Sequence, residues 1–370
     1  MSFLFSVLIV FSQKWHGKHS HDHDLTGVQK FHGTAVPRIG GIAVVAGVLL
    51  GLLAFMLVFP RAIIESNARS VLLLMAASLP AFVAGIAEDF TKTVSVKIRL
   101  SATICSALIA SYLLGATVDQ LDIWGFDALL TITPVAVMVT AFVVAGGANA
   151  INIIDGFNGL SVSISLIMAC ALGVVGWQVG DDLVVILCAL AAGAALGFLM
   201  LNYPAGKLFL GDGGAYFLGF WVAEIAVLLL VRNDSVNAWQ VLAICAYPVI
   251  EVLFSIYRRR FVKKRSAGAP DALHLHTLVY RRVVTRLVEF VPGKDWRRNA
   301  TVAFVIVPVV ALMASCSVLV GHTMIGGIVM VLLQAALYWA YYGRLVRGRW
   351  RRNRARCADA VGAKTRLDPL

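Results

Sequence analysis

Residues 71–90 of the chain read VLLLMAASLPAFVAGIAEDF, an apolar run that ends in two adjacent carboxylates, Glu88 and Asp89. A helix needs about 20 predominantly apolar residues to cross a bilayer, so this run predicts a membrane span with an acidic inner end. Nine further runs of this kind lie at residues 39–59, 100–115, 129–147, 160–179, 183–201, 215–231, 238–256, 302–320 and 324–342. The sequence therefore predicts ten spans.

The first residues, 1–11, are apolar but form a short run. They lack a basic leading region and a small-residue cleavage site, which disfavours a signal peptide. We expect an eleventh, abbreviated span here, and an interfacial helix remains an alternative.

The composition agrees with a membrane protein. Of the 370 residues, 59% are hydrophobic and 14% are charged, whereas a soluble domain has about 25% charged residues. We predict an all-α fold, a polytopic membrane helical bundle of 10 or 11 transmembrane helices with functional cytoplasmic loops. Residues 1–370 are expected to form one integral membrane domain.

The basic residues predict the orientation of the bundle, because Lys and Arg are retained on the cytoplasmic side of the membrane. With an inner amino-terminal loop, only Arg61, Arg69 and Arg232 of the 32 Lys and Arg residues lie outside. This predicts a multi-pass protein of the inner membrane whose polar motifs face the cytoplasm. Residues 257–301 form a long basic inner loop and residues 343–370 a basic cytoplasmic tail.

The net charge of +12 does not indicate nucleic-acid binding. The basic runs flank membrane spans, where attraction to anionic headgroups of about 1 kcal/mol per residue explains them. The six cysteines have no paired spacing, and most lie within spans, so neither a disulfide framework nor a zinc site is indicated.

Five polar segments fall at the predicted inner face. The first, residues 19–41, contains Lys30 and Arg38 ahead of Gly40 and Gly41. Paired glycines allow close backbone approach where a span begins, although a tight helix start would also explain them. The His and Asp residues between positions 19 and 24 could ligate a transition metal, but such tracts are usually only solvated.

The second segment contains the adjacent Glu88 and Asp89. Two neighbouring carboxylates repel each other and are costly near hydrocarbon, so a cation or a raised pKa is the natural resolution. Magnesium suits such a site, since it takes one or two carboxylates together with water and substrate phosphates. Arg99, further along the segment, could bind phosphate oxygens. An ordinary charged loop remains the alternative.

The third segment carries Asn149, Asn152 and Asp155 at intervals of three residues. On a helix this spacing places them on one face, where they can bind a polar ligand or form a buried structural network. Glycines on either side of Asn158 break the helix and leave backbone groups free for a base or sugar edge.

The fourth and fifth segments complete the set. Asp212 lies between glycines just before an apolar helix, so its carboxylate and the first N–H groups of that helix face the same volume. His274 and His276 alternate in the long basic loop. We expect them to donate hydrogen bonds to a diphosphate rather than to bind zinc, because no cysteine lies nearby.

Taken in order, these segments resemble the polyprenyl-phosphate N-acetylhexosamine-1-phosphate transferase family, glycosyltransferase family 4. The resemblance extends from about residue 19 to residue 282. It implies an acidic-pair position at Glu88 and Asp89, a magnesium-ligand position at Asp212, a polar helix that faces the nucleotide sugar, a basic phosphate contact and a histidine loop. Mg²⁺ is the implied cofactor, with Mn²⁺ as a substitute. The implied roles are catalytic for Glu88, Asp89, Asp155 and His274; substrate-binding for Lys30, Arg99, Asn149, Asn152, Asn158 and His276; and metal-binding for Asp212 and Asp89.

The family's reaction implies a Mg-dependent phosphotransferase that moves a sugar-1-phosphate from a UDP-N-acetylhexosamine to undecaprenyl phosphate and releases UMP. Glu88 departs from the family's usual Asp, and Asn158 replaces a frequent Asp. Thr277 stands where the peptidoglycan enzyme of the family has a third histidine, which favours the branch that transfers GlcNAc-1-phosphate and initiates cell-surface polysaccharide or O-antigen synthesis.

Three alternatives remain open at this stage. One is the phospho-MurNAc-pentapeptide transferase of peptidoglycan synthesis. Another, from a different class, is a multi-pass transporter, because Glu224 and Glu251 lie within apolar runs. Lipid-facing and dimer-forming surfaces are both apolar, so a homodimer also remains open.

Overall fold

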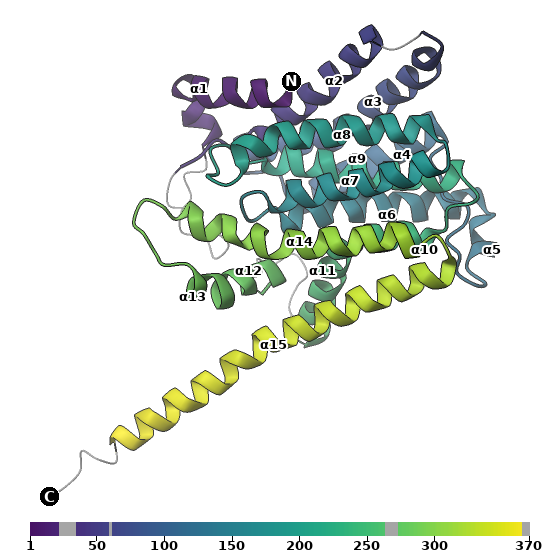
Figure 1. Cartoon of the computed structure of the whole chain (residues 1–370). Helices are drawn as coiled ribbons and strands as arrows, with labels where there is room; N and C mark the ends of the chain where they lie inside the picture. The colour runs from purple at the N-terminus through teal and green to yellow at the C-terminus, as the bar shows by residue number, and fades with distance from the viewer. Residues whose placement is uncertain (22–34, 59–60, 263–272, 365–370) are drawn as a thin grey trace, which may run out of the picture.

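The computed structural model describes residues 1–21, 35–58, 61–262 and 273–364 of the chain. Within these ranges the protein is a bundle of α-helices (Figure 1), and the β-pairing there is an isolated bridge between His21 and Pro37. The all-α prediction is confirmed.

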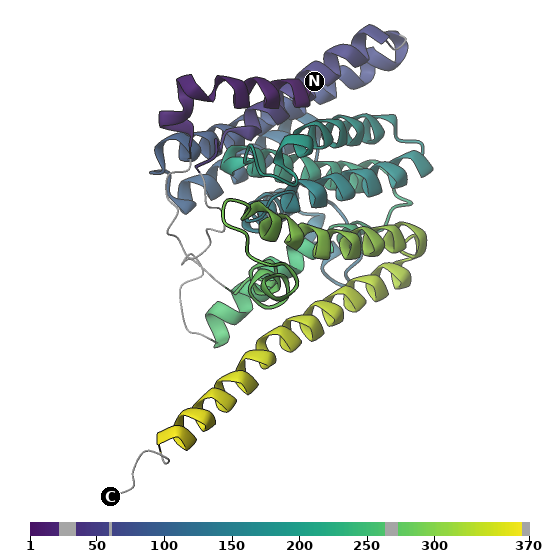
Figure 2. The ribbon, with the colours of Figure 1, turned by 60° about the vertical axis from the view of Figure 1, so that its left-hand side comes forward.

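Nine helices of the described ranges are long and apolar enough to cross a membrane. They are α2 (Gly40–Val58), α3 (Arg61–Thr91), α4 (Val96–Leu114), α6 (Thr133–Ile154), α7 (Leu160–Gln178), α8 (Asp182–Asn202), α9 (Gly211–Arg232), α14 (Trp296–Val320) and α15 (Met324–Lys364). Helix α15 leaves the bundle and continues beyond it (Figures 1 and 2). The short helices are α5 (Asp127–Leu130), α12 (Leu275–Val279) and α13 (Thr285–Leu287), with a π-helical turn η2 (Tyr280–Val284).

The predicted span 238–256 is broken in the structure. It forms α10 (Ala238–Ile244) and α11 (Ala246–Tyr257), which are bent by 83° and could together make a tenth span. A π-helical turn, η1 (Arg258–Val262), continues α11. Pro248 explains the break, because a proline ring clashes with the carbonyl four residues earlier, that of Ile244. The expectation of one continuous helix was wrong at this point.

Helix α1 (Ser2–Ser20) extends the predicted 1–11 segment and packs against α2 and α8. A Cβ atom at Gly47 would lie only 2.6 Å from Cβ of Ser2, so α1 begins part-way along α2. Helix α1 is not among the candidate spans, and the described ranges therefore contain nine or ten spans rather than eleven.

Helix α9 is the centre of the bundle. It packs against α2, α3, α4, α6, α7 and α8, and 78% of its most apolar stretch is buried, compared with 22% for α15. Trp221, Phe217 and Phe220 are among its fully buried side chains. Residues at the start of α9 are therefore held by several neighbouring helices at once.

Glycines allow α2 and α3 to approach the start of α9. A Cβ atom at Gly41 would collide with the backbone of Gly214, and a Cβ at Gly85 would lie 2.6 Å from N and Cα of Gly213. Real Cβ atoms do not come this close to backbone, so the three helices can cross here only because these positions have no side chain.

We predict that Gly85→Ala lowers the thermal unfolding temperature of the purified protein. The added methyl group must push α3 away from α9, and overpacking of this kind costs about 1–3 kcal/mol. Gly146→Ala is the matched control, because a Cβ there would meet nothing within 4 Å. Equal unfolding temperatures for the two variants would contradict the close crossing.

Candidate functional site

Asp89, near the end of α3, caps the amino-terminus of α9. Its Oδ1 accepts a hydrogen bond from the N–H of Asp212 at 2.8 Å, and its Oδ2 accepts one from Gly213 at 2.9 Å. The N-cap position of α9, Leu210, provides no side-chain cap. The first N–H groups of a helix lack intrahelical partners and carry partial positive charge, so a carboxylate from another helix satisfies them.

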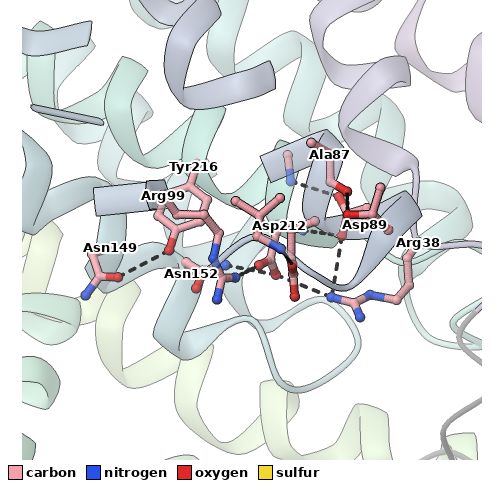
Figure 3. Close-up of polar contacts among 12 residues, drawn as sticks. Arg38, Ala87, Asp89, Arg99, Asn149, Asn152, Asp212 and Tyr216 are labelled. Atoms are coloured by element: carbon pink, nitrogen blue, oxygen red, sulfur yellow. Dashed lines mark hydrogen bonds and ion pairs between the residues drawn. The ribbon is translucent and has the colours of Figure 1, made fainter. Parts of the chain in front are cut away.

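Arg38 joins the two aspartates. Its Nη2 lies 3.4 Å from Oδ1 of Asp89 and 3.3 Å from Oδ1 of Asp212 (Figure 3). Backbone hydrogen bonds between residues 37–41 and residues 209–210 hold the Arg38 segment beside the start of α9. The loop before α2 and the loop before α9 thus form one unit.

Asp212 receives two further donors. Arg99 of α4 forms an ion pair with its Oδ2, and Nδ2 of Asn152 donates to its Oδ1 at 3.2 Å. The side chain of Asp212 is 14% exposed, whereas that of Asp89 is 0% exposed. Asp212 is therefore the carboxylate of this pair that a ligand can reach.

The predicted polar face of α6 points toward α9. Asn152 contacts Asp212, and Oδ1 of Asn149 accepts a hydrogen bond from the hydroxyl of Tyr216 at 3.4 Å. The guanidinium of Arg99 lies 6.0 Å from the Tyr216 ring centroid (Figure 3). Four helices, α3, α4, α6 and α9, together with the segment before α2, therefore meet in one polar cluster.

Asp155 follows the end of α6 and accepts a hydrogen bond from the hydroxyl of Ser161. Burial raises the pKa of this carboxyl to about 6, while the hydrogen bond from Ser161 and the charge of Arg38 act in the opposite direction. Asp155 therefore changes charge in the pH range where many enzymes operate.

Two predicted residues have structural contacts outside the cluster. Oε2 of Glu88 accepts a hydrogen bond from the N–H of Val94 at 2.8 Å, which closes the turn after α3. Asn158 is buried, and its Nδ2 donates to the carbonyl of Pro204 at 3.0 Å. Its N–H donates to Oδ1 of Asn299 at 2.7 Å. Asn158 thus joins three segments of the fold.

His274 and His276 are both buried, and their rings stack in parallel with centroids 5.2 Å apart. Nδ1 of His274 lies 2.9 Å from Oε1 of Glu251. The His276 ring packs edge-on against Phe157, with centroids 5.7 Å apart. His276 therefore lies against the turn between α6 and α7 that begins at Asp155, and His274 lies behind it.

Some predicted residues lie outside the described ranges, namely Lys30 and the His and Asp tract between residues 22 and 24. Arg38 was noted ahead of two glycines and Glu251 within an apolar run, but neither was assigned a role at this site from sequence. Tyr216 and Ser161 were not singled out from the sequence.

In the described ranges no three His, Cys, Asp or Glu side chains come close enough to form a metal cage. Magnesium does not need one, since it is usually held by one or two carboxylates with water and substrate phosphates. Asp212 can supply one such carboxylate because its side chain is partly exposed, once a substrate phosphate takes over the two arginines that pair with it here. The residues present therefore fit a magnesium site of this open type.

Residues 71–230 match the family described as glycosyl transferase family 4. "Undecaprenyl-phosphate alpha-N-acetylglucosaminyl 1-phosphate transferase" of Thermotoga maritima is 31% identical to this chain over 281 residues, which cover 76% of the chain and 79% of the relative. The protein of the same name from Escherichia coli (strain K12) is 26% identical over 357 residues, or 94% of the chain and 90% of the relative. "Probable undecaprenyl-phosphate N-acetylglucosaminyl 1-phosphate transferase" of Bacillus subtilis (strain 168) is 27% identical over 250 residues, or 67% of the chain and 66% of the relative.

We predict that Asp89→Asn lowers the unfolding temperature much more than Glu88→Gln. An asparagine has one acceptor oxygen, so it cannot accept both N–H groups of α9 as Asp89 does. The Arg38 guanidinium also loses a buried carboxylate partner, and such a loss typically costs about 3–5 kcal/mol. Glu88 is the matched control because it is the adjacent carboxylate, is only half-buried and closes a local turn. Thermal unfolding followed by tryptophan fluorescence in detergent measures both. If Asp89→Asn were as stable as the wild type, its capping role would be refuted.

Proposed function

The chain belongs to glycosyl transferase family 4, and we propose that it transfers N-acetylglucosamine-1-phosphate from a UDP-sugar to undecaprenyl phosphate, releasing UMP. The named activity of its relatives supports this proposal. The single observation that carries it is the Asp212 cluster, in which two arginines and a polar helix face surround one reachable carboxylate at an end of a membrane bundle.

Phosphoryl transfer depends mainly on alignment and on neutralisation of charge. Arg38 and Arg99 suit this task because a guanidinium is always charged and binds phosphate through two parallel hydrogen bonds. Both arginines contact Asp212, so a phosphate bound here would lie next to the same carboxylate. The cluster can thus hold an anionic substrate and a cation side by side.

We propose Mg²⁺ as the cofactor and Asp212 as its protein ligand, with Mn²⁺ as a substitute. When bound, the metal would neutralise charge on the diphosphate. Asp89 is fully buried and both of its oxygens accept N–H groups of α9, so its role in this proposal is to position Asp212.

Asp155 is the proposed group that orients the acceptor or takes a proton from it. With a pKa of about 6, it is mostly ionised at neutral pH. A phosphate monoester has its second pKa near about 6 and is also largely dianionic there. The acceptor therefore needs little help from a base, and we propose a single displacement without a covalent enzyme intermediate.

The protein is a multi-pass membrane protein. We propose that it resides in the inner membrane with the Asp212 cluster at the cytoplasmic face, because almost all Lys and Arg residues fall in the loops at that end. A transporter would place its functional acids near the bilayer midplane, whereas Asp89 and Asp212 lie at helix ends. The names of the relatives and Thr277 favour the polysaccharide branch over the peptidoglycan enzyme.

The direct test is UMP release by purified protein supplied with UDP-GlcNAc, undecaprenyl phosphate and magnesium. We expect turnover by the wild type, and a loss of about 100- to 1000-fold in Asp212→Asn, the range seen when one electrostatic contact to a transition state is removed. Asp119→Asn, in an exposed outer loop, is the control with unchanged turnover.

The same assay separates the alternatives. Turnover of UDP-MurNAc-pentapeptide instead of UDP-GlcNAc would assign the chain to peptidoglycan synthesis. Wild-type protein that released no UMP from either donor would refute the proposed function, and a folded Asp212→Asn variant with near-normal turnover would remove Asp212 from the site.

We predict that Ser161→Ala shifts the acidic limb of the pH–rate profile to higher pH. The hydrogen bond from Ser161 favours the ionised form of Asp155, so its loss raises the pKa of Asp155 and extends the inactive, protonated range upward. A hydrogen bond to a charged group is worth about 1.5 kcal/mol or more and one pKa unit is 1.36 kcal/mol, so we expect a shift of about one unit.

Ser165→Ala is the matched control. Ser165 lies one turn further along α7, and its buried hydroxyl has no hydrogen-bond partner among the described residues. Its profile should coincide with that of the wild type. A Ser161→Ala limb that stays in place, or moves to lower pH, would show that Asp155 does not control this titration.

A further inference from the structure

Glu251 is a buried carboxylate that binds the histidine loop, residues 273–279. It belongs to α11 and is 1% exposed. Its Oε1 lies 2.9 Å from Nδ1 of His274 and accepts the N–H of Leu275 at 3.0 Å, while Oε2 lies 3.3 Å from the same N–H. One side chain therefore fixes both the His274 ring and the first residue of α12.

The partners of His274 specify its tautomer. Nη2 of Arg259 lies 3.3 Å from Nε2 of the ring. A guanidinium can only donate hydrogen bonds, so Nε2 must accept and the proton of the neutral ring must be on Nδ1. That N–H then donates to Glu251, as a carboxylate requires. Both neighbours select the same form of the ring.

The position of His274 is passed on to the candidate site through His276. The two rings are parallel within 3° with centroids 5.2 Å apart, so the position of the His274 ring limits the positions open to the His276 ring. His276 in turn packs on Phe157, and a Cβ atom at Gly156 would lie 3.8 Å from its Nε2. Gly156 directly follows Asp155, so His276 lies beside the turn that carries the titrating carboxyl.

A buried glutamate among the described helices does not always accept hydrogen bonds, as Glu224 shows. Glu224, on α9, is 0% exposed, and neither of its carboxyl oxygens has a hydrogen-bond partner among the described residues. The described part of the bundle therefore contains one buried glutamate without such partners and one that accepts hydrogen bonds from the histidine loop.

We propose that Glu251 is a positioning residue for the transferase: it holds His274 in the Nδ1–H form and thereby places His276 against the Asp155 turn. Its kinetic consequence rests on the proposed function. In this proposal Glu251 acts through His274, so the two residues form one unit.

A double-mutant cycle of Glu251→Ala and His274→Ala in the full-length protein tests the unit. Displacement of a catalytic group by about 1 Å can cost about 100-fold, so we expect each single variant to lose about 10- to 100-fold in kcat. Residues that act as a unit are not additive, so the double variant should have the kcat of His274→Ala alone. Glu251→Gln keeps an acceptor oxygen at the same reach and should restore kcat to within about fivefold of the wild type.

Amide hydrogen exchange of the peptide containing Leu275–Val279 provides a readout that needs no turnover. We expect faster exchange there in Glu251→Ala, because the Leu275 N–H loses its acceptor, and wild-type exchange and kcat in the control Glu224→Gln. Two outcomes would overturn the proposal. One is a double variant whose loss of kcat equals the product of the losses in the two single variants. The other is an unchanged exchange rate of the peptide in Glu251→Ala. An inactive wild type would instead refute the proposed function, while the exchange data would still decide whether Glu251 holds the loop.

Discussion

The carboxylate of Asp89 at the amino-terminus of α9 is the contact on which the rest of the site depends. It is fully buried and accepts hydrogen bonds from the N–H groups of Asp212 and Gly213. Asp212 lies on this same first turn, so the contact that completes the helix also determines where the reachable carboxylate points. For Asp89 to reach these N–H groups, the backbones of α3 and α9 must come close together. Gly85 permits this because it has no side chain.

The charges of the cluster also explain why it can be buried. Two carboxylates in this position would repel each other strongly, but Arg38 and Arg99 supply two positive charges and the start of α9 adds a partial one. Charges removed from water are tolerated when they are paired and hydrogen-bonded. Entry of phosphates and a cation adds charges of both signs, so the balance can be kept while the partners of Asp212 change.

Much of this could be predicted from sequence, because apolar runs and three-residue spacing are local signals. The runs gave the helical bundle, and the spacing of Asn149 and Asn152 gave the face that meets α9. Pro248 could also have indicated the break in the run 238–256, which was predicted as one span. What could not be predicted depends on contacts between distant segments: that Asp89 caps a helix, that Asn158 joins loops, and that Glu251 accepts from His274.

The α6–α7 turn connects the two polar groups that the fold builds separately. On one side the polar face of α6 leads from Asn149 to the Asp212 cluster, and on the other Phe157 and Gly156 contact His276. Asp155 lies between them and is bound by Ser161 of the next helix. The turn therefore gives the histidine loop and the Asp212 cluster a common point of attachment, although they come from residues far apart in the chain. Such a link suits the alignment of two anionic substrates, because the reaction requires the two phosphates to be fixed relative to each other.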